Sequence, residues 1–255
     1  LDVQNLNRKP LTHDVSFQLR EGEIVGMAGL VGSGRSEVAQ VIFGFTPAHS
    51  GSITIDGKPI RVKNPGHAMR HGIAYLPEDR GTQGLIRPMD VRENTSLTVL
   101  RALSRATFIN RRKETKLAVD TISKLNIRAY GPHQIVGKLS GGNQQKVVVG
   151  KWLATAPRVL IADEPTRGID VGAKAEIHRL MSELAQQGLA ILMISSELPE
   201  VLGMSDRILV MREGRLVAEF SRAEATQENI GMAMMGNVAV NNHHQPVEQP
   251  QADGV

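Results

Sequence analysis

The chain has 255 residues, of which 41% are hydrophobic, 22% charged and 3% aromatic, and its formal net charge is +4. It contains no cysteine, which excludes a disulfide framework, a thiolate nucleophile and a cysteine-ligated metal site. Because the net charge is small and aromatic residues are few, the composition argues against nucleic acid as a partner. No apolar run approaches the roughly 18 residues of a membrane span.

Short apolar runs alternate with longer amphipathic segments along most of the chain. The runs predict strands, and they cover residues 24–28, 53–55, 73–76, 159–162, 189–194 and 208–211. Uninterrupted apolar runs of this kind are typical of strands buried on both faces of a parallel sheet. Apolar residues at helical spacing predict helices over 37–43, 111–125 and 173–187. The alternation predicts an α/β domain with a mostly parallel central sheet.

Two segments depart from this alternation. Residues from about 85 to 155 are almost wholly helical in pattern, so they predict a helical insertion between two strands of the sheet. Residues 237–255 contain few large apolar side chains and cannot bury enough surface to offset the entropy of ordering, so we expect a disordered tail. The chain begins at Leu1 without a methionine, which we interpret as the start of a piece cut from a longer chain.

A glycine-rich loop follows the predicted strand 24–28. It comprises Gly29, Leu30, Val31, Gly32, Ser33, Gly34, Arg35 and Ser36. The spacing predicts a phosphate-binding loop, in which backbone N–H groups and a helix N-terminus contact phosphate oxygens and the last hydroxyl binds Mg²⁺. Arg35 stands where lysine is usual, and its planar guanidinium is bulkier than an ammonium. We therefore expect the loop to keep phosphate binding better than it keeps the positioning of the transition state. A glycine-rich turn without a ligand is the alternative.

Two acidic residues follow the predicted strand 159–162. We expect Asp163 to hold Mg²⁺ opposite Ser36, and Glu164 to polarise the water that attacks a γ-phosphate. The carboxyl ends of strands are where open α/β sheets place their active sites. A solvated loop start is the alternative, and the upstream phosphate loop favours the catalytic interpretation.

A second phosphate-binding pattern lies within the helical insertion. It consists of Leu139, Ser140, Gly141, Gly142, Asn143 and Gln144. A serine and two glycines at a helix start present a hydroxyl and backbone N–H groups to an anion. A second such helix end is redundant within one chain, unless it contacts a nucleotide that another domain holds. The order of phosphate loop, helical insertion, Leu-Ser-Gly-Gly signature and acidic strand resembles the ATP-binding cassette (ABC) ATPases over nearly the whole ordered length.

This resemblance implies a P-loop NTPase fold with a mostly parallel core sheet, an antiparallel β subdomain and a helical subdomain inserted at about 85–155. Residues 1–236 would form a single cassette, followed by the tail. Segments 76–80, 163–174 and 195–201 resemble one subgroup, the ATP-binding subunits of monosaccharide importers of the ribose, galactose, arabinose and xylose type. Such subunits contain two cassettes, and this chain resembles the C-terminal one.

The resemblance also implies cofactors, partners and a location. The chain would be an ATPase, of the translocase class, that uses ATP and Mg²⁺ to power sugar import. Its partners would be the N-terminal cassette of the same parent chain, a membrane permease and, indirectly, a periplasmic sugar-binding protein. It would lie peripherally on the cytoplasmic face of the bacterial inner membrane, with its signature capping ATP held by the partner cassette.

Besides the loop lysine, three elements of the ABC pattern are altered. Glu78 aligns with the usual glutamine and can still bind Mg²⁺ or water, but adds a negative charge. Ser196 aligns with the usual switch histidine and cannot bridge a γ-phosphate and Glu164 as an imidazole would. Residues 6–14 lack the aromatic ring expected to stack on adenine.

These changes affect the ATP-holding side and leave the signature intact. They predict a cassette that binds ATP, hydrolyses it slowly and mainly completes the partner's site. The alternative to an energy-coupling ATPase is therefore a catalytically weak regulatory half. An ABC ATPase acting on DNA or the ribosome is disfavoured because the chain has neither long coiled-coil arms nor an interdomain linker. A P-loop GTPase is disfavoured because no Asn-Lys-x-Asp motif is present.

Overall fold

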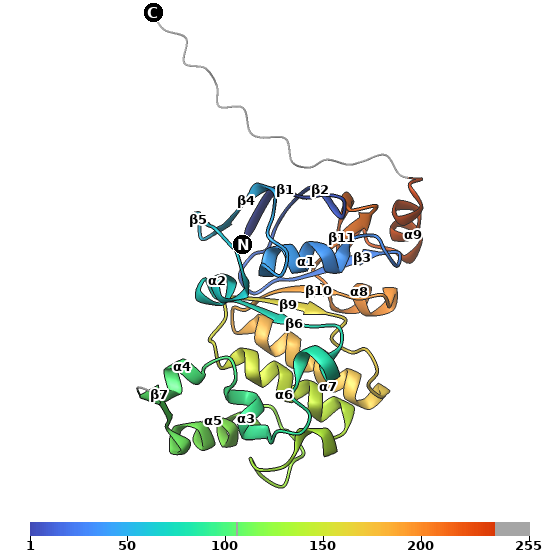
Figure 1. The fold of residues 1–255 in the computed structure, drawn as a ribbon. Helices are drawn as coiled ribbons and strands as arrows, with labels where there is room; N and C mark the ends of the chain where they lie inside the picture. Colours follow the sequence, from blue (N-terminus) through green and yellow to red (C-terminus); the bar gives the residue numbers. More distant parts are fainter. Residues whose placement is uncertain (106, 238–255) are drawn as a thin grey trace, which may run out of the picture.

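A six-stranded sheet forms the centre of the protein, whose computed structural model describes residues 1–105 and 107–237 (Figure 1). The strand order is β12-β11-β3-β10-β9-β6. The strands are β3 (Ile24–Gly29), β6 (Ile73–Leu76), β9 (Val159–Asp163), β10 (Ala190–Ile194), β11 (Arg207–Arg212) and β12 (Arg215–Ser221). Neighbouring strands run parallel except β11 and β12, which form an antiparallel hairpin. The predicted α/β class with a mostly parallel core sheet is confirmed.

A four-stranded antiparallel sheet packs on one side of this centre, at the top of Figure 1. Its order is β2-β1-β4-β5, from β1 (Asp2–Arg8), β2 (Thr12–Gln18), β4 (Ser50–Ile55) and β5 (Lys58–Ile60). The prediction that 53–55 belongs to the parallel sheet was wrong. In β4 only Ile53 and Ile55 are buried and Thr54 between them is not, which is the alternation of a strand with one covered face.

Five helices flank the two sheets. They are α1 (Arg35–Phe43), α2 (Pro65–Arg70), α7 (Val171–Gln186), α8 (Leu198–Met204) and α9 (Gln227–Met235). Helix α7 begins two residues before the predicted 173–187 because Asp170 caps it, accepting a hydrogen bond of 2.9 Å from the amide of Ala173. In Figure 1, α1 lies between the two sheets, whereas α7 lies on the opposite side of the central sheet.

The segment between β6 and β9 forms the helical insertion. It contains η1 (Arg80–Gly84), α3 (Val91–Ser96), α4 (Leu100–Leu103), α5 (Arg111–Lys124), η2 (Val136–Lys138) and α6 (Gly141–Leu153). The insertion is not wholly helical, because β7 (Ser104–Arg105) and β8 (Phe108–Ile109) form a small hairpin. Helix α6 packs on both β6 and α7, so it joins the insertion to the central sheet.

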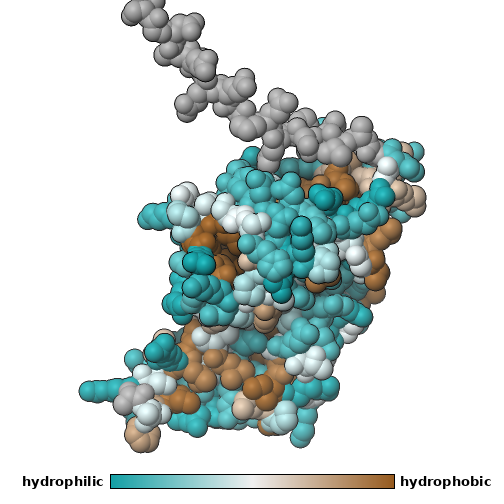
Figure 2. Space-filling model, turned by 45° about the horizontal axis from the view of Figure 1, so that its top comes forward, coloured by the Kyte–Doolittle hydropathy of each residue, from teal (hydrophilic) through white to brown (hydrophobic). Residues whose placement is uncertain are grey.

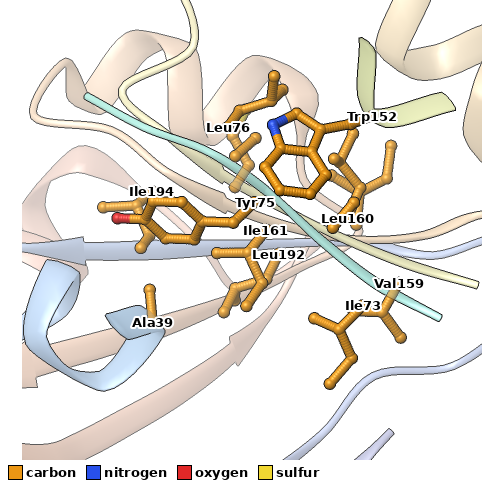
Figure 3. Close-up of a cluster of buried hydrophobic side chains, with 14 of the residues drawn as sticks. Ala39, Ile73, Tyr75, Leu76, Trp152, Val159, Leu160, Ile161, Leu192 and Ile194 are labelled. Carbon is orange, nitrogen blue, oxygen red and sulfur yellow. The ribbon is translucent and has the colours of Figure 1, made fainter. Parts of the chain in front are cut away.

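An aromatic cluster lies where the insertion meets the sheet. Tyr75 of β6 and Trp152 of α6 are buried, together with apolar side chains of β9 and β10 (Figure 3). Phe43 of α1 contacts both rings, with centroids 5.2 Å from Tyr75 and 5.5 Å from Trp152. These contacts fix α1 and α6 to the same strand, and α1 is the helix that follows the glycine-rich loop.

The face drawn in Figure 2 is mostly polar, with separate apolar patches. The most exposed large apolar side chains are those of Val31, Phe108, Tyr130 and Val171. Among the described residues, no helix combines the length and hydropathy that a bilayer-spanning segment requires. Apart from Asn237, the predicted disordered tail lies outside the described residues.

Candidate active site

The glycine-rich loop connects the carboxyl end of β3 to the first turn of α1. Gly34 is the N-cap residue at φ 99°, and no side chain caps this helix end. Gly29 has no room for a side chain, because a Cβ there would lie 2.4 Å from the Ser33 hydroxyl oxygen. That hydroxyl is itself buried without a hydrogen-bond partner. The loop therefore presents uncapped amide groups and an unpaired hydroxyl, as an anion site requires.

Ser36 and Asp163 meet across the site, as the sequence predicts. The Ser36 hydroxyl donates a 3.0 Å hydrogen bond to one carboxylate oxygen of Asp163, and the Tyr75 hydroxyl donates one of 2.8 Å to the other. Burial raises the pKa of Asp163 above its ordinary value, although both hydrogen bonds act in the opposite direction. Sequence reasoning missed Tyr75, because an aromatic residue inside an apolar run carries no sign of its hydroxyl's partner.

These residues fit a magnesium ion. A hydroxyl and a carboxylate supply the hard oxygen ligands that Mg²⁺ prefers, and it commonly takes the rest from water and substrate phosphates. A cation would also compensate the burial that disfavours charge on Asp163. Within the described residues no cluster of three or more His, Asp or Glu could hold a metal alone. The pair is therefore suited to an ion that arrives with a phosphate ligand.

Glu164 lies next to this pair, and two side chains contact its carboxylate. Its backbone is left-handed, with φ 48°, a strained conformation for a residue with a side chain. The Ser196 hydroxyl donates to its carboxylate at 3.1 Å, and the Arg35 guanidinium lies 3.9 Å away. Burial raises the pKa of Glu164, and the hydrogen bonds from Ser196 and the charge of Arg35 oppose that rise.

Arg35 points across the site to the end of β10. It is buried, and its guanidinium donates a 2.6 Å hydrogen bond to the carbonyl oxygen of Ser195. The guanidinium of Arg35 is thus hydrogen-bonded to a carbonyl oxygen and lies within ion-pair distance of Glu164. Ser196, at the switch position, contacts Glu164 directly although it lacks an imidazole.

Glu78 belongs to a different group of contacts. It forms an ion pair with Arg167, in the loop that follows Glu164. Arg80 donates to two carbonyl oxygens of the same loop, at 2.6 Å to Arg167 and 2.9 Å to Gly168. The segment leading into the insertion is therefore tied to the loop after Glu164. A role for Glu78 in binding Mg²⁺ or water stays a prediction.

The signature forms the start of α6. Ser140 is its N-cap residue, yet its hydroxyl makes no capping bond to a backbone amide. It instead accepts a hydrogen bond of 2.8 Å from the side-chain amide (Nδ2) of Asn143. Gln144 donates to the carbonyl oxygens of Val136 and Leu139, which fixes the loop before the helix. No hydrogen bond or ion pair in the described part of the chain joins the signature to the phosphate loop. The amides at the start of α6 therefore have no side-chain cap and no bond to this chain's own phosphate loop.

The segment expected to hold an adenine-stacking ring lies beside the phosphate loop. A Cβ on Gly34 would lie 3.1 Å from the carbonyl oxygen of Leu11. Of the two residues that could stack in place of a ring, Arg8 is bonded to His49 and the ring of His13 to a carbonyl. Leu11, in the same segment, is 49% exposed.

Comparisons with known proteins agree with this arrangement. Residues 12–167 match the ABC transporter family. The chain is 54% identical over 239 residues to the ribose import ATP-binding protein RbsA of Rhodococcus jostii, covering 94% of this chain and 48% of that protein. It is 53% identical over 230 residues to a putative ribose/galactose/methyl galactoside import ATP-binding protein of Rhizobium etli, covering 90% and 44%. The chain thus spans about half the length of the curated relatives it matches.

Solved structures give the same fold. A nucleotide-free ATP-binding cassette from an ABC transporter superimposes with a TM-score of 0.77 at 24% identity, covering 92% of this chain and 94% of that one. An ATP-binding cassette dimer in a post-hydrolysis state with ADP and Pi gives 0.72 at 21% identity, covering 87% and 98%. With the phosphate loop, the acidic pair and the signature in one α/β domain, this chain belongs to the ABC transporter family.

Proposed function

We propose that this chain is one ATP-binding cassette of a two-cassette subunit that powers monosaccharide import through a membrane permease. The names and roughly doubled length of the relatives support this assignment, because each matches the chain over 90% or more of its residues. In this proposal the partners are the N-terminal cassette of the parent chain, the permease and, indirectly, a periplasmic sugar-binding protein. The cassette would act at the cytoplasmic face of the inner membrane.

The contact between Ser36 and Asp163 is the observation that carries the nucleotide site. Amide groups of residues 29–36 would bind the phosphates of ATP, and Ser36 and Asp163 would hold Mg²⁺, which supplies charge neutralisation on the phosphates. Glu164 would accept a hydrogen bond from the attacking water. The signature, from Leu139 to Gln144, would cap ATP on the partner cassette, because no side chain caps the amides at the start of α6 and the Ser140 hydroxyl, which accepts from the Asn143 side chain, still has its proton to donate.

The contacts of Arg35 favour a catalytically weak half. A lysine ammonium is compact enough to lie between phosphates, whereas this guanidinium is bonded to Ser195 and lies beside Glu164. A cation so close to Glu164 weakens it as an acceptor of a proton from water. Ser196 adds a second donor to the same carboxylate. We therefore expect ATP binding here to exceed ATP hydrolysis.

Two variants of the parent two-cassette subunit test this proposal. Glu164→Gln removes the base of this cassette, and Ser140→Arg blocks the site that its signature completes. We expect Glu164→Gln to retain most of the ATPase rate and Ser140→Arg to lose most of it, with sugar uptake into proteoliposomes following the same order. The asymmetric role is wrong if Glu164→Gln abolishes turnover while Ser140→Arg leaves it intact.

A further inference from the structure

Glu200 is a buried carboxylate outside the predicted site. It lies on α8 and is 7% exposed. Three donors from three different elements surround it: the Thr166 hydroxyl at 2.8 Å, the Ser195 hydroxyl and Nε2 of His178. Because a carboxylate only accepts, each of these groups donates to it. A buried charge is retained at this position only with such a full set of partners.

One of these donors belongs to the residue that organises the neighbours of Glu164. The Ser195 carbonyl oxygen accepts the 2.6 Å hydrogen bond from Arg35, and the next residue, Ser196, donates to Glu164 at 3.1 Å. The Ser195 hydroxyl oxygen also accepts 3.0 Å from the amide of Glu197. The position of Ser195 therefore affects both side chains that contact Glu164: Arg35 is bonded to its carbonyl oxygen, and Ser196 is the next residue in the chain.

Thr166 connects the same carboxylate to the other side of the site. It lies two residues after Glu164, in the loop that follows β9, and is 2% exposed. The amide of Glu164 donates to the carbonyl oxygen of Ile194 at 2.9 Å, directly before Ser195. Glu200 therefore bonds the segments on both sides of Glu164, whereas an apolar residue at this position would fill the space without orienting a hydroxyl.

We propose that Glu200 is a positioning residue: by holding Ser195 and Thr166, it sets where Arg35 and Ser196 meet Glu164. The inference rests on the proposed function, because Glu164 matters for catalysis only if this cassette binds nucleotide. Glu200 itself does not touch the reacting atoms in this scheme. Its effect on Arg35 passes through the hydroxyl of Ser195, and its bond to Thr166 ties the same carboxylate to the loop that carries Glu164.

The test compares Glu200→Gln with Glu197→Gln in the 255-residue chain. Glu197 is acidic, starts the same helix and pairs with Lys174 of α7, but its side chain does not bond Ser195. The readout is the hydrogen exchange of the Arg35 guanidinium by ¹⁵N NMR, with the signal assigned from its loss in Arg35→Lys. We expect exchange at least tenfold faster in Glu200→Gln and within twofold of the unsubstituted chain in Glu197→Gln. Equal exchange in Glu200→Gln and the unsubstituted chain overturns the proposal.

A second variant separates positioning from general destabilisation. Ser195→Ala keeps Glu200 and removes the hydroxyl through which it acts, so it should accelerate Arg35 exchange to the same extent, and the double variant should add nothing further. Additive effects contradict the proposal, because they mean that Glu200 acts by another route. Ser195→Ala also serves where Glu200→Gln does not fold.

A kinetic measurement in the parent subunit links the contact to catalysis. With the partner cassette inactivated, Glu200→Gln should raise kcat about tenfold, because Arg35 and Ser196 then weaken Glu164 less, and should leave KM for ATP unchanged, whereas Glu197→Gln should change neither. A rise in KM with unchanged kcat contradicts a positioning role. If this cassette shows no turnover at all, its proposed catalytic function fails, while the Arg35 exchange rates still decide the role of Glu200.

Discussion

Replacing Arg35 by lysine tests the energetic weight of the contact that distinguishes this phosphate loop. A lysine ammonium ends short of the position from which the guanidinium reaches the Ser195 carbonyl at 2.6 Å. A hydrogen bond from a charged donor contributes about 1.5–3 kcal/mol, and both residues are buried. The attraction to Glu164 is partly kept, since the positive charge remains. We therefore expect Arg35→Lys to lower the free energy of unfolding by about 2 kcal/mol, or roughly 4–8 °C in Tm.

The same substitution should have the opposite effect on nucleotide binding. Once the side chain is released from Ser195, its compact charge is free for phosphates, and we expect MgATP to bind about tenfold more tightly, roughly 1.4 kcal/mol. The assay is thermal unfolding with and without MgATP, since a ligand that binds the native state raises Tm. Arg112→Lys, at an exposed position of α5, is the matched control and should change stability by less than about 0.5 kcal/mol.

One combined result refutes this reasoning. If Arg35→Lys unfolds at the same temperature as the unsubstituted chain and MgATP shifts both equally, then the bond to Ser195 neither stabilises the fold nor competes with phosphate. The proposal that Arg35 weakens hydrolysis in this half would lose its physical basis.

Three further predictions concern stability and its dependence on pH. Burial lowers the pKa of Lys151 to about 8, so between about pH 8 and 10 the unfolded chain binds more protons than the folded chain. The free energy of unfolding should therefore rise with pH over this range, by up to about 3 kcal/mol relative to the Lys151→Met variant, as measured by urea titration. Burial acts to raise the pKa of Glu23, but hydrogen bonds from an arginine side chain and a backbone amide outweigh it and leave that pKa below its ordinary value. Glu23→Gln should therefore cost about 3 kcal/mol at pH 7. The difference should start to shrink as the pH falls through the ordinary carboxyl pKa of about 4.3 and should vanish only below the lowered pKa of the folded state, so a difference that stays constant from pH 7 to about pH 2 contradicts the linkage. Gly142→Ala would bring a Cβ to 2.5 Å from the Cβ of Ala173 on α7 and should lower the free energy of unfolding by about 1–3 kcal/mol. The control Gly203→Ala, in open space on α8, should raise it slightly. Similar changes in the two variants would show that α6 can move away from α7 at little cost.

Strands buried on both faces could be predicted from the sequence, whereas of the strands with one covered face only β4 was predicted in part, as the run 53–55. The run 73–76 coincides with β6, and the runs for β3, β9, β10 and β11 differ from the observed strands by one residue at one or both ends. By contrast, polar residues separate the apolar residues of β1 and β2, which therefore form no continuous apolar run, and the apolar run of β12 covers only 216–218. Their pairing depends on partners that are distant in the chain.

The residues that lie on loops with a fixed motif could also be predicted, whereas those that support them could not. The sequence predicts Ser36 opposite Asp163, and the structure brings the two within 3.0 Å. Tyr75, Ser195 and Glu200 were missed, because each acts through a partner that only the folded chain places beside it. The direction of the Arg35 guanidinium was missed for the same reason: the substitution is visible in the sequence, but its acceptor is 160 residues away.

The position of Trp152 gives this protein an optical reporter of its own. The chain contains a single tryptophan, which lies on α6, the helix that begins at the signature (Figure 3). Its ring is nearly perpendicular to that of Phe43 of α1, with the centroids 5.5 Å apart. Its fluorescence therefore reports on the interface between the inserted helices and the part of the domain that contains the phosphate loop. A rotation of the inserted helices relative to the central sheet would change the apolar surroundings of the indole. Such a rotation could therefore be followed by fluorescence in the unlabelled chain.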